Sequence, residues 1–345
     1  MFELLKRLSE VSAPAGYEAP VAEIIKAELD SLGIKHVTTP DGSIIGIMKS
    51  ERSGAGRLML QAHMDEVGFM VKSHRKEGHL SLTPLGITDT ALLTGRRVVI
   101  HGSEPFNGYI GAVPVHLSNG KSVPDYEDIY VDIGASSEGT AKKAVPLGSF
   151  GSFRTEFESF GEDLGFVKGK ALSSRIPCAV ILDAIKKLTE RSAHLPYDLY
   201  LAFTARGKLS LCSAGAVYRR IGADGVISVV GTDSMDTPSE KNSRLSLGQG
   251  IAVPLTEEKY SYDTEITSHL RRTAADSAMQ LQNIAPIPKT KDTDYDLLRM
   301  KNAGARLGVI RIPVRYKNTP CEAAAKCDIT SAALLLTEAL MTIDL

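Results

Sequence analysis

A histidine and an aspartate two residues apart are the side chains of this sequence most suited to chemistry. His63 and Asp65 stand near the start of Leu58–Val71, after an apolar run with the character of a strand. Because side chains alternate along a strand, the two residues are expected on one face. An imidazole beside a carboxylate that orients its second nitrogen is typical of hydrolytic metal sites. A satisfied turn would contain the same pair, so its meaning depends on the rest of the chain.

The elements before and just after this pair indicate a domain that is interrupted by a β-rich insertion. Apolar spacing predicts helices over Phe2–Leu8 and Val21–Gly33, and a hairpin over Lys35–Met48 that turns at Asp41-Gly42. Short strand patterns with frequent turns follow, without a long helical pattern. The clearest of these patterns are Gly68–His74, Gly78–Gly86, Arg96–Gly102, Gly108–Leu117 and Asp128–Ala135.

After the insertion, strands alternate with helices, which is typical of an α/β sheet. A long amphipathic helix is expected to begin near Gly169–Arg175, with Ser173 or Ser174 as its N-cap. Further strands are expected at Asp198–Ala205, Asp224–Gly231 and Arg306–Val314, and further helices at Ala214–Gly222, His269–Leu281 and Ile329–Met341. The sequence thus predicts one α/β domain made of residues 1–67 and 165–345, and an inserted β-rich domain at 68–164.

Length and composition agree with a globular protein of two domains. The chain has 345 residues, which is long for one hydrophobic core. Its net charge of −1 gives no electrostatic reason to expect nucleic acid or an acidic membrane as a partner. No signal-peptide pattern and no run of about 20 apolar residues is present. The four cysteines have no CxxC spacing, so a cytoplasmic location is expected.

Eight segments, in their order and spacing, resemble one family of peptidases. They are Leu4–Glu18, Gln61–Val71, Leu92–Gly102, Gly108–Leu117, Asp128–Glu138, Gly169–Arg175, Asp236–Val253 and Val314–Ala323. The chain is similar here to the tetrahedral aminopeptidases, also called glutamyl or deblocking aminopeptidases and sometimes labelled endoglucanases. The resemblance implies a zinc-aminopeptidase-like α/β/α sandwich with an inserted small β-barrel-like domain. It also implies a cytoplasmic hydrolase that forms large hollow homo-oligomers and removes N-terminal residues from peptides with two divalent metal ions, zinc or cobalt.

The resemblance assigns each part of the family's metal centre to a residue here. His63 keeps the first ligand position, and Asp65 keeps the acid that orients it. The aspartate that bridges both metals corresponds to Ser173, in the segment Ser173-Ser174-Arg175. A hydroxyl is a poor ligand and cannot bridge two cations as a carboxylate does.

The other positions of that centre are also replaced. The general-base glutamate corresponds to Gly207, and the ligand glutamate after it corresponds to Lys208. Counting back six residues from Asp236, which begins an Asp-Thr-Pro motif, places Val230 where the family has a ligand aspartate. Asn318 stands where the family has its last ligand histidine.

These replacements are balanced in charge. Four carboxylates are lost together with two divalent cations, and Lys208 adds one ammonium. A buried carboxylate cluster without metals would repel itself, and joint loss avoids that cost. The interpretation is a pseudoenzyme, with no metal expected and little or no peptidase activity.

Three alternatives stay open from the sequence. A relocated metal site could use acids from the set Asp233, Asp236, Asp292, Asp294 and Asp296. A metal-independent hydrolase could use Ser173 and Lys208 as a nucleophile pair. The chain could also bind peptides without cutting them, or join active paralogues in a mixed shell.

The remaining histidines and two of the cysteines are interpreted as structural. His74, His79, His101 and His116 lie in the insertion without the spacing of metal ligands. Cys178 and Cys212 have apolar surroundings that suit buried thiols more than nucleophiles.

Overall fold

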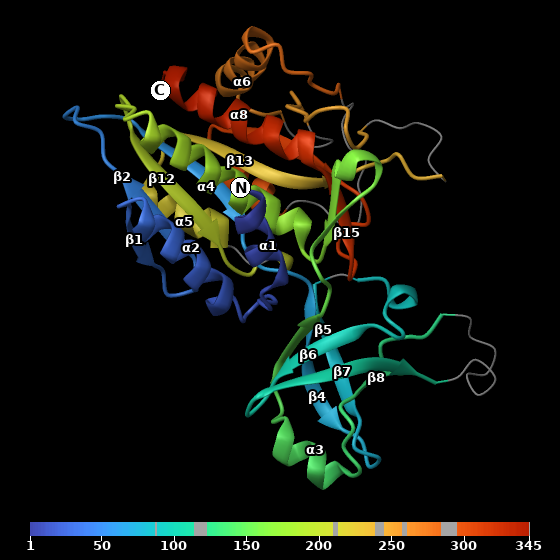
Figure 1. Ribbon diagram of the computed structural model, residues 1–345. Helices are drawn as coiled ribbons and strands as arrows, with labels where there is room; N and C mark the ends of the chain where they lie inside the picture. The colour runs from blue at the N-terminus through green and yellow to red at the C-terminus, as the bar shows by residue number, and fades with distance from the viewer. Residues whose placement is uncertain are drawn as a thin grey trace.

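A six-stranded sheet between two layers of helices forms the larger part of the molecule (Figure 1). The computed structural model describes residues 1–86, 88–113, 123–209, 213–238, 245–256, 261–283 and 295–344. The strands are β1 (Lys35–Thr38), β2 (Ile44–Met48), β3 (Arg57–His63), β12 (Asp198–Thr204), β13 (Gly225–Asp233) and β14 (Leu307–Val314). Their order is β1-β2-β12-β3-β13-β14, and the four strands from β12 to β14 run parallel. The long apolar runs of these four strands are explained by burial on both faces.

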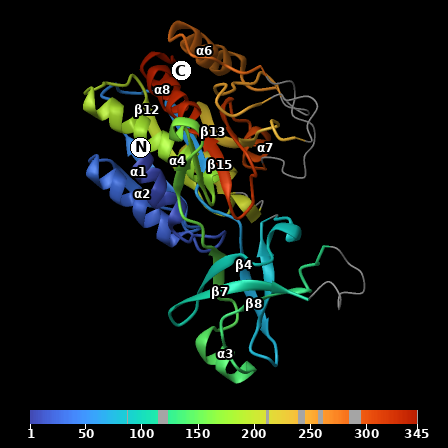
Figure 2. The ribbon, with the colours of Figure 1, turned by 45° about the vertical axis from the view of Figure 1, so that its right-hand side comes forward.

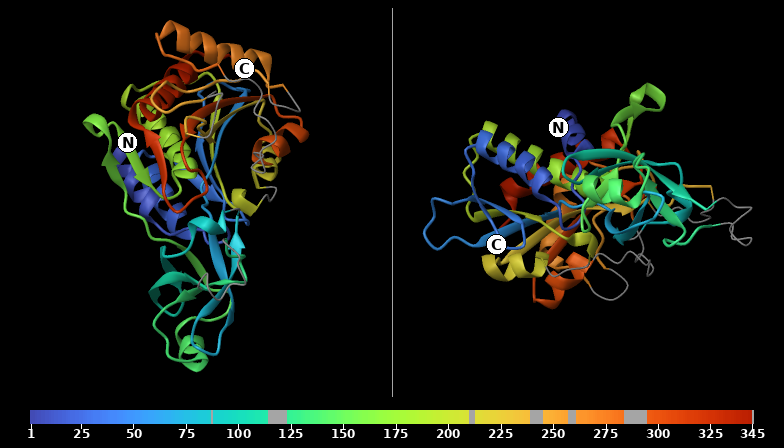
Figure 3. Two further views of the ribbon diagram at one scale, coloured as in Figure 1. Left: turned by 90° about the vertical axis from the view of Figure 1, so that its right-hand side faces the viewer. Right: turned by 90° about the horizontal axis from the view of Figure 1, so that it is seen from below.

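Helices cover both faces of this sheet, as Figure 3 shows from the side. One face packs against α1 (Phe2–Glu10), α2 (Ala19–Ser31), α4 (Leu172–Glu190), α6 (Thr264–Asp276) and α8 (Lys326–Thr342). The other face packs against α5 (Ser213–Ile221) and α7 (Tyr295–Asn302). The α/β/α sandwich predicted from the sequence is therefore confirmed.

The insertion forms a closed barrel that projects from one end of the sandwich (Figures 1 and 2). Its strands are β4 (Gly68–His74), β5 (Leu80–Leu85), β6 (Arg97–His101), β7 (Pro105–Ala112), β8 (Ile129–Asp132) and β9 (Phe150–Phe153). Apolar side chains fill the interior, with the short helix α3 (Glu138–Ala144) packed against them. A second sheet of β10 (Glu158–Phe160), β11 (Phe166–Gly169) and β15 (Glu322–Ala325) lies where the chain returns to the sandwich.

Two local predictions are wrong. Neither Ser173 nor Ser174 caps α4, because the helix begins at Leu172 and Ala171 is its N-cap. The helix α6 begins five residues before the predicted start at His269, because the Asp263 side chain accepts hydrogen bonds from the N–H groups of Glu265 and Ile266. In both cases the caps were missed, while the apolar faces were recognised.

The fold has a further property that concerns membranes. Among the described residues, no helix combines the length and the apolar character needed to cross a bilayer.

Candidate functional site

The predicted site residues gather at the carboxyl ends of the parallel strands. His63 is the last residue of β3, and Gly207 and Lys208 follow the end of β12 in a short 3₁₀ turn, Gly207–Leu209. Asn318 follows the end of β14, and Ser173 lies in the first turn of α4. This edge of a parallel sheet is where α/β proteins place ligand sites.

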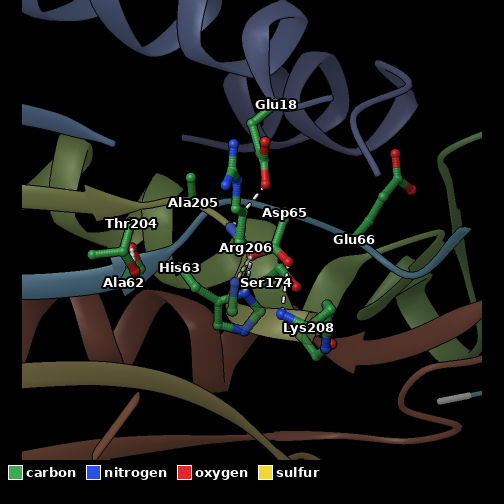
Figure 4. Close-up of polar contacts among 12 residues, drawn as sticks. Glu18, Ala62, His63, Asp65, Glu66, Ser174, Thr204, Ala205, Arg206 and Lys208 are labelled. Carbon is green, nitrogen blue, oxygen red and sulfur yellow. Dashed lines mark hydrogen bonds and ion pairs between the residues drawn. The ribbon is translucent and has the colours of Figure 1, made fainter. Parts of the chain in front are cut away.

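Asp65 is the hydrogen-bonding centre of this cluster (Figure 4). Its Oδ1 atom lies 3.1 Å from Nδ1 of His63 and accepts the N–H of Gly207 at 2.9 Å. Its Oδ2 atom accepts the N–H of Lys208 at 2.7 Å. Burial alone would raise the pKa of Asp65, but the contacts with His63 and Lys208 hold it below its usual value. Asp65 therefore remains an anion that orients the His63 imidazole.

The contact between His63 and Asp65 arises differently from the sequence prediction. The strand ends at His63, so Asp65 lies in the turn beyond it and strand alternation does not apply. The chain bends back at this point, and the N–H groups after β12 hold the carboxylate in place. The pairing was predicted correctly, but its cause was not.

Lys208 and Asn318, which the resemblance assigns to two ligand positions, bond directly to each other. The Nζ atom of Lys208 donates to Oδ1 of Asn318 at 2.6 Å. The ammonium thus bonds to an amide, while only the backbone N–H of Lys208 reaches Asp65. In the part of the chain that the structure describes, no carboxylate oxygen lies within 4 Å of this ammonium, and Coulombic interaction links it to Asp65 and Glu322.

Glu322, which the sequence reasoning missed, organises the other half of the cluster. Its carboxylate accepts the N–H of Ser173 at 2.5 Å and the Ser173 hydroxyl at 3.0 Å. It also accepts the N–H of Asn318 at 2.8 Å. Burial raises its pKa, while the charge of Lys208 and these hydrogen bonds oppose that rise. A single acid within the run of small residues Cys321–Ala325 was the sequence signal for this role.

Gly207, which the resemblance assigns to the general base, has little room around it for a side chain. A Cβ atom on Gly207 would lie 2.9 Å from Cβ of His63 and 3.1 Å from Oδ1 of Asp65. A larger residue would therefore have to displace His63.

Val230 belongs to the apolar cluster between the sheet and α5. Parallel pairing of β3 with β13 sets Gln61 opposite Ser228. The paired register ends at these two residues, and Val230 follows two residues further along β13. The assignment of Val230 to a ligand position stays a prediction from the resemblance.

Comparison with known proteins places this arrangement in a family. The sequence pattern of the M42 glutamyl aminopeptidases matches residues 42–335. The chain belongs to the M42 family. It is 26% identical to the lysyl aminopeptidase of Pyrococcus furiosus, over 97% of this chain and 95% of that protein. It is 26% identical to the glutamyl aminopeptidase of Lactococcus lactis, over 92% and 89% of the two chains. Its fold matches a TET aminopeptidase of a Thaumarchaeota archaeon with a TM-score of 0.92 and 26% identity, over 100% and 97% of the two chains.

M42 proteins are in general dinuclear metal peptidases, and the residues of this chain do not fit such a centre. In the described ranges, no three or more His, Cys, Asp or Glu side chains are grouped so that they could hold a metal ion. An ammonium stands at one ligand position, bonded to the amide at another. The hydroxyl at the bridging position is bonded to Glu322. A dinuclear centre needs several carboxylate or imidazole ligands around each ion.

Ser174 and Arg175, the two residues after Ser173, are both buried but have different contacts. The Ser174 hydroxyl is buried and has no hydrogen-bond partner among the residues that the structure describes. Arg175 is fully buried, and its Nη2 atom donates to the Ala13 carbonyl at 3.3 Å and lies 3.5 Å from Glu66. Glu66 points away from His63 in Figure 4 and binds Lys170 at 2.6 Å. Burial lowers the pKa of Lys170 to about 8.

The acids considered for a relocated metal site either make other contacts or have side chains that the structure does not describe. Both oxygens of Asp236 bind the Arg315 guanidinium, at 2.9 and 2.6 Å, and these contacts lower its pKa to about 2 despite the opposing effect of burial. Asp233 ends β13 and has interactions of its own. Asp292 and Asp294 lie outside the described residues, and the side chain of Asp296 is not described.

The remaining predicted residues make structural contacts where they are described. His74 Nε2 lies 2.7 Å from the Val145 carbonyl, and His101 Nε2 lies 2.7 Å from the Ser12 hydroxyl. His79 Nε2 is 3.9 Å from Asp132. Burial raises the pKa of the Cys178 thiol to about 12, which makes it a poor nucleophile at neutral pH. His116 and Cys212 lie outside the described residues.

Proposed function

We propose that this chain keeps the M42 aminopeptidase fold but has lost the dinuclear metal chemistry, and that it has little or no peptidase activity. In this proposal residues 1–67 and 165–345 form the peptidase-like domain, and 68–164 form the inserted β domain. The three cysteines that the structure describes are free thiols, which supports a cytoplasmic location.

One observation carries the proposal: the ammonium of Lys208 is bonded to Asn318 at 2.6 Å. Both residues stand at ligand positions, so a divalent cation would have to lie against a positive charge. Two positive charges a few ångström apart, as on neighbouring ligand positions, repel each other by several kcal/mol in a partly buried site. In this proposal the Lys208 ammonium supplies the positive charge that metal ions supply in the family's centre.

The chemistry of the hydroxyl and of the glycine supports the same conclusion. A Ser–Lys mechanism needs the lysine amine within hydrogen-bond reach of the serine. The Ser173 hydroxyl donates to Glu322, whereas Lys208 donates to Asn318. Gly207 cannot accept a proton from water, and its surroundings leave little room for a residue that could.

An activity assay tests the proposal directly. The purified chain is incubated with aminoacyl-p-nitroanilides, including glutamyl and lysyl substrates, in zinc and in cobalt. We expect no release of the chromophore above the rate without protein. Turnover that depends on added metal and disappears in His63→Ala would contradict the proposal.

Restoring the ligands tests the assignment of each position. The combined substitutions Ser173→Asp, Lys208→Glu, Val230→Asp and Asn318→His should recover metal binding. Because Val230 lies in an apolar cluster, the new carboxylate should destabilise the metal-free variant. Added zinc should then raise its melting temperature by mass action.

The four-fold variant also serves as the control that shows whether turnover needs the general base. Adding Gly207→Glu is required for turnover, provided that His63 moves to admit the new side chain. Zinc binding without turnover in the four-fold variant, and turnover only in the five-fold variant, is the expected pattern. A four-fold variant that zinc does not stabilise would show that the ligand positions are wrongly assigned.

A role in assembly or peptide binding remains the second candidate. Apolar side chains are exposed on both domains, with Tyr109 and Leu147 on the barrel side and Leu255 and Tyr316 on the sandwich. Large exposed apolar residues favour contact between copies or with paralogues. Light scattering after size-exclusion chromatography should give a mass at least twice the 37.1 kDa of one chain. A monomer at micromolar concentration, with no paralogue co-purified, would refute the assembly role.

A further inference from the structure

A pocket separate from the metal positions lies between the β1–β2 hairpin and α5. Its volume is about 450 Å³, which is within the range of pockets that hold small molecules. Pro40, Ala216 and Val217 give it an apolar wall. Arg206, which is partly buried, and Arg220, which is exposed, also line it. None of the predicted ligand positions lines it.

Among the described residues, the two arginines have no anionic partner. Across the described ranges, neither Arg206 nor Arg220 forms an ion pair with a carboxylate, and neither guanidinium donates a hydrogen bond. Arg206 Nε is buried and still lacks an acceptor. A buried donor without a partner is unusual and indicates a missing acceptor.

Arg206 also has an unusual backbone conformation. Its φ angle is +58°, in the left-handed region that side chains other than glycine rarely adopt. Its N–H donates to Glu18 at 2.8 Å, which fixes this conformation. Strained backbone positions occur often at binding sites, where the surrounding structure maintains them.

The one carboxylate in the pocket is already engaged. Asp41 accepts hydrogen bonds from the hydroxyls of Thr39 and Ser43, the latter at 3.1 Å. Ser213 of α5 is a further hydrogen-bond partner of Asp41. Asp41 bonds to neither arginine, so among the described residues the pocket has two cations without an anionic partner and one anion that is already hydrogen-bonded. The charge of the pocket is complementary to an anionic ligand.

We infer that this pocket binds a small organic oxyanion with an apolar body, of the class of aliphatic or aromatic carboxylates. The guanidinium groups would take the two oxygens of the carboxylate, because their planar donor geometry matches it. The apolar wall formed by Pro40, Ala216 and Val217 would cover the hydrocarbon part of the ligand. This inference does not depend on the state of the metal positions.

Binding of a fluorescent probe tests the inference. Anilinonaphthalene sulfonate combines an aromatic body with an oxyanion, and octanoate provides a competitor of the proposed class. With the full-length protein, we expect saturable binding at one site that octanoate displaces and octanol does not. The double substitution Arg206→Gln with Arg220→Gln should weaken probe binding by about tenfold or more.

Two further variants separate this pocket from general surface binding. Arg219→Gln removes a neighbouring exposed charge on α5 that does not line the pocket, and it should leave the affinity unchanged. Ala216→Phe should fill the pocket and abolish binding, with the melting temperature confirming that the variant is folded. Equal weakening by Arg219→Gln, unchanged affinity in the double variant, or no saturable binding to the wild type would overturn the inference.

Discussion

Glu322 is a single carboxylate that takes over a structural task usually done by a helix cap. Ala171, at the N-cap of α4, has no side chain that can accept a hydrogen bond. The Glu322 carboxylate accepts the N–H and the hydroxyl of Ser173, and also the N–H of Asn318. It thereby joins the start of α4 to the loop after β14, which holds the partner of Lys208.

Removing this carboxylate should destabilise the protein. Glu322→Ala leaves three buried donors without an acceptor, and we expect a loss of about 3 kcal/mol in the free energy of unfolding. Glu322→Gln keeps the shape and one acceptor, so its loss should be smaller. Urea denaturation measures both values. An alanine variant as stable as the wild type would contradict the proposed capping role.

The ion pair between Asp236 and Arg315 predicts an acid-dependent loss of stability. The pKa of Asp236 is lowered to about 2 in the folded protein, below the ordinary value of 3.8. Between these two values the unfolded chain binds more protons, so stability falls as the pH falls. Asp236→Asn should flatten this part of the stability curve, measured as the urea midpoint between about pH 2 and pH 5. Parallel curves for wild type and variant would exclude a contribution from Asp236.

Much of the site at the residue scale could be predicted from the sequence, because it rests on short motifs. His63 and Asp65 were recognised from their type and spacing, whereas Gly207 and Lys208, which follow β12, were assigned through the family resemblance. Glu322 and the bond between Lys208 and Asn318 could not be predicted, because they join segments that are 110 and more residues apart. A motif shows which residues follow one another, while such contacts depend on how strand ends meet.

At the scale of elements, the first turn of α4 is pressed against β13. A Cβ atom on Gly231 would lie 2.4 Å from the carbonyl oxygen of Ser173 and 2.5 Å from its Cα. These are backbone atoms that cannot move without shifting the helix. The close approach of α4 to the sheet thus depends on the absence of a side chain at this glycine.

Gly231→Ala should therefore destabilise the protein by about 2 kcal/mol through overpacking. Gly139→Ala in α3 is the matched control, since the nearest atom to its new Cβ would be 3.9 Å away. Alanine at that helical position should be neutral or slightly stabilising. Thermal unfolding of both variants checks the prediction. A tolerated Gly231→Ala together with a destabilising Gly139→Ala would contradict this packing account.

The longer elements could be recognised from apolar periodicity, whereas several short ones, such as α3, α7 and β15, were missed. For the recognised helices, the errors lie at their ends. The starts of α4 and α6 differ from the prediction because Ala171 and Asp263 decide where the helices begin. The closed barrel was expected only through the family resemblance, since short strand patterns do not show how strands pair.

At the scale of the molecule, the chain has the M42 sandwich and its barrel. The sheet, the two helical layers and the barrel are held by three apolar clusters that do not involve a metal. At the sheet edge, Lys208, Asn318 and Glu322 hold the loops together. The proposed loss of the metal centre is therefore compatible with the fold, because its core does not depend on metal ions.

The loss of the dinuclear centre is tested by the metal content of the protein, purified without chelator and measured by mass spectrometry. We expect close to no zinc, cobalt or other divalent transition metal per chain, also after dialysis against zinc and removal of the excess. About two tightly held metal ions per chain, as a dinuclear centre requires, would contradict it.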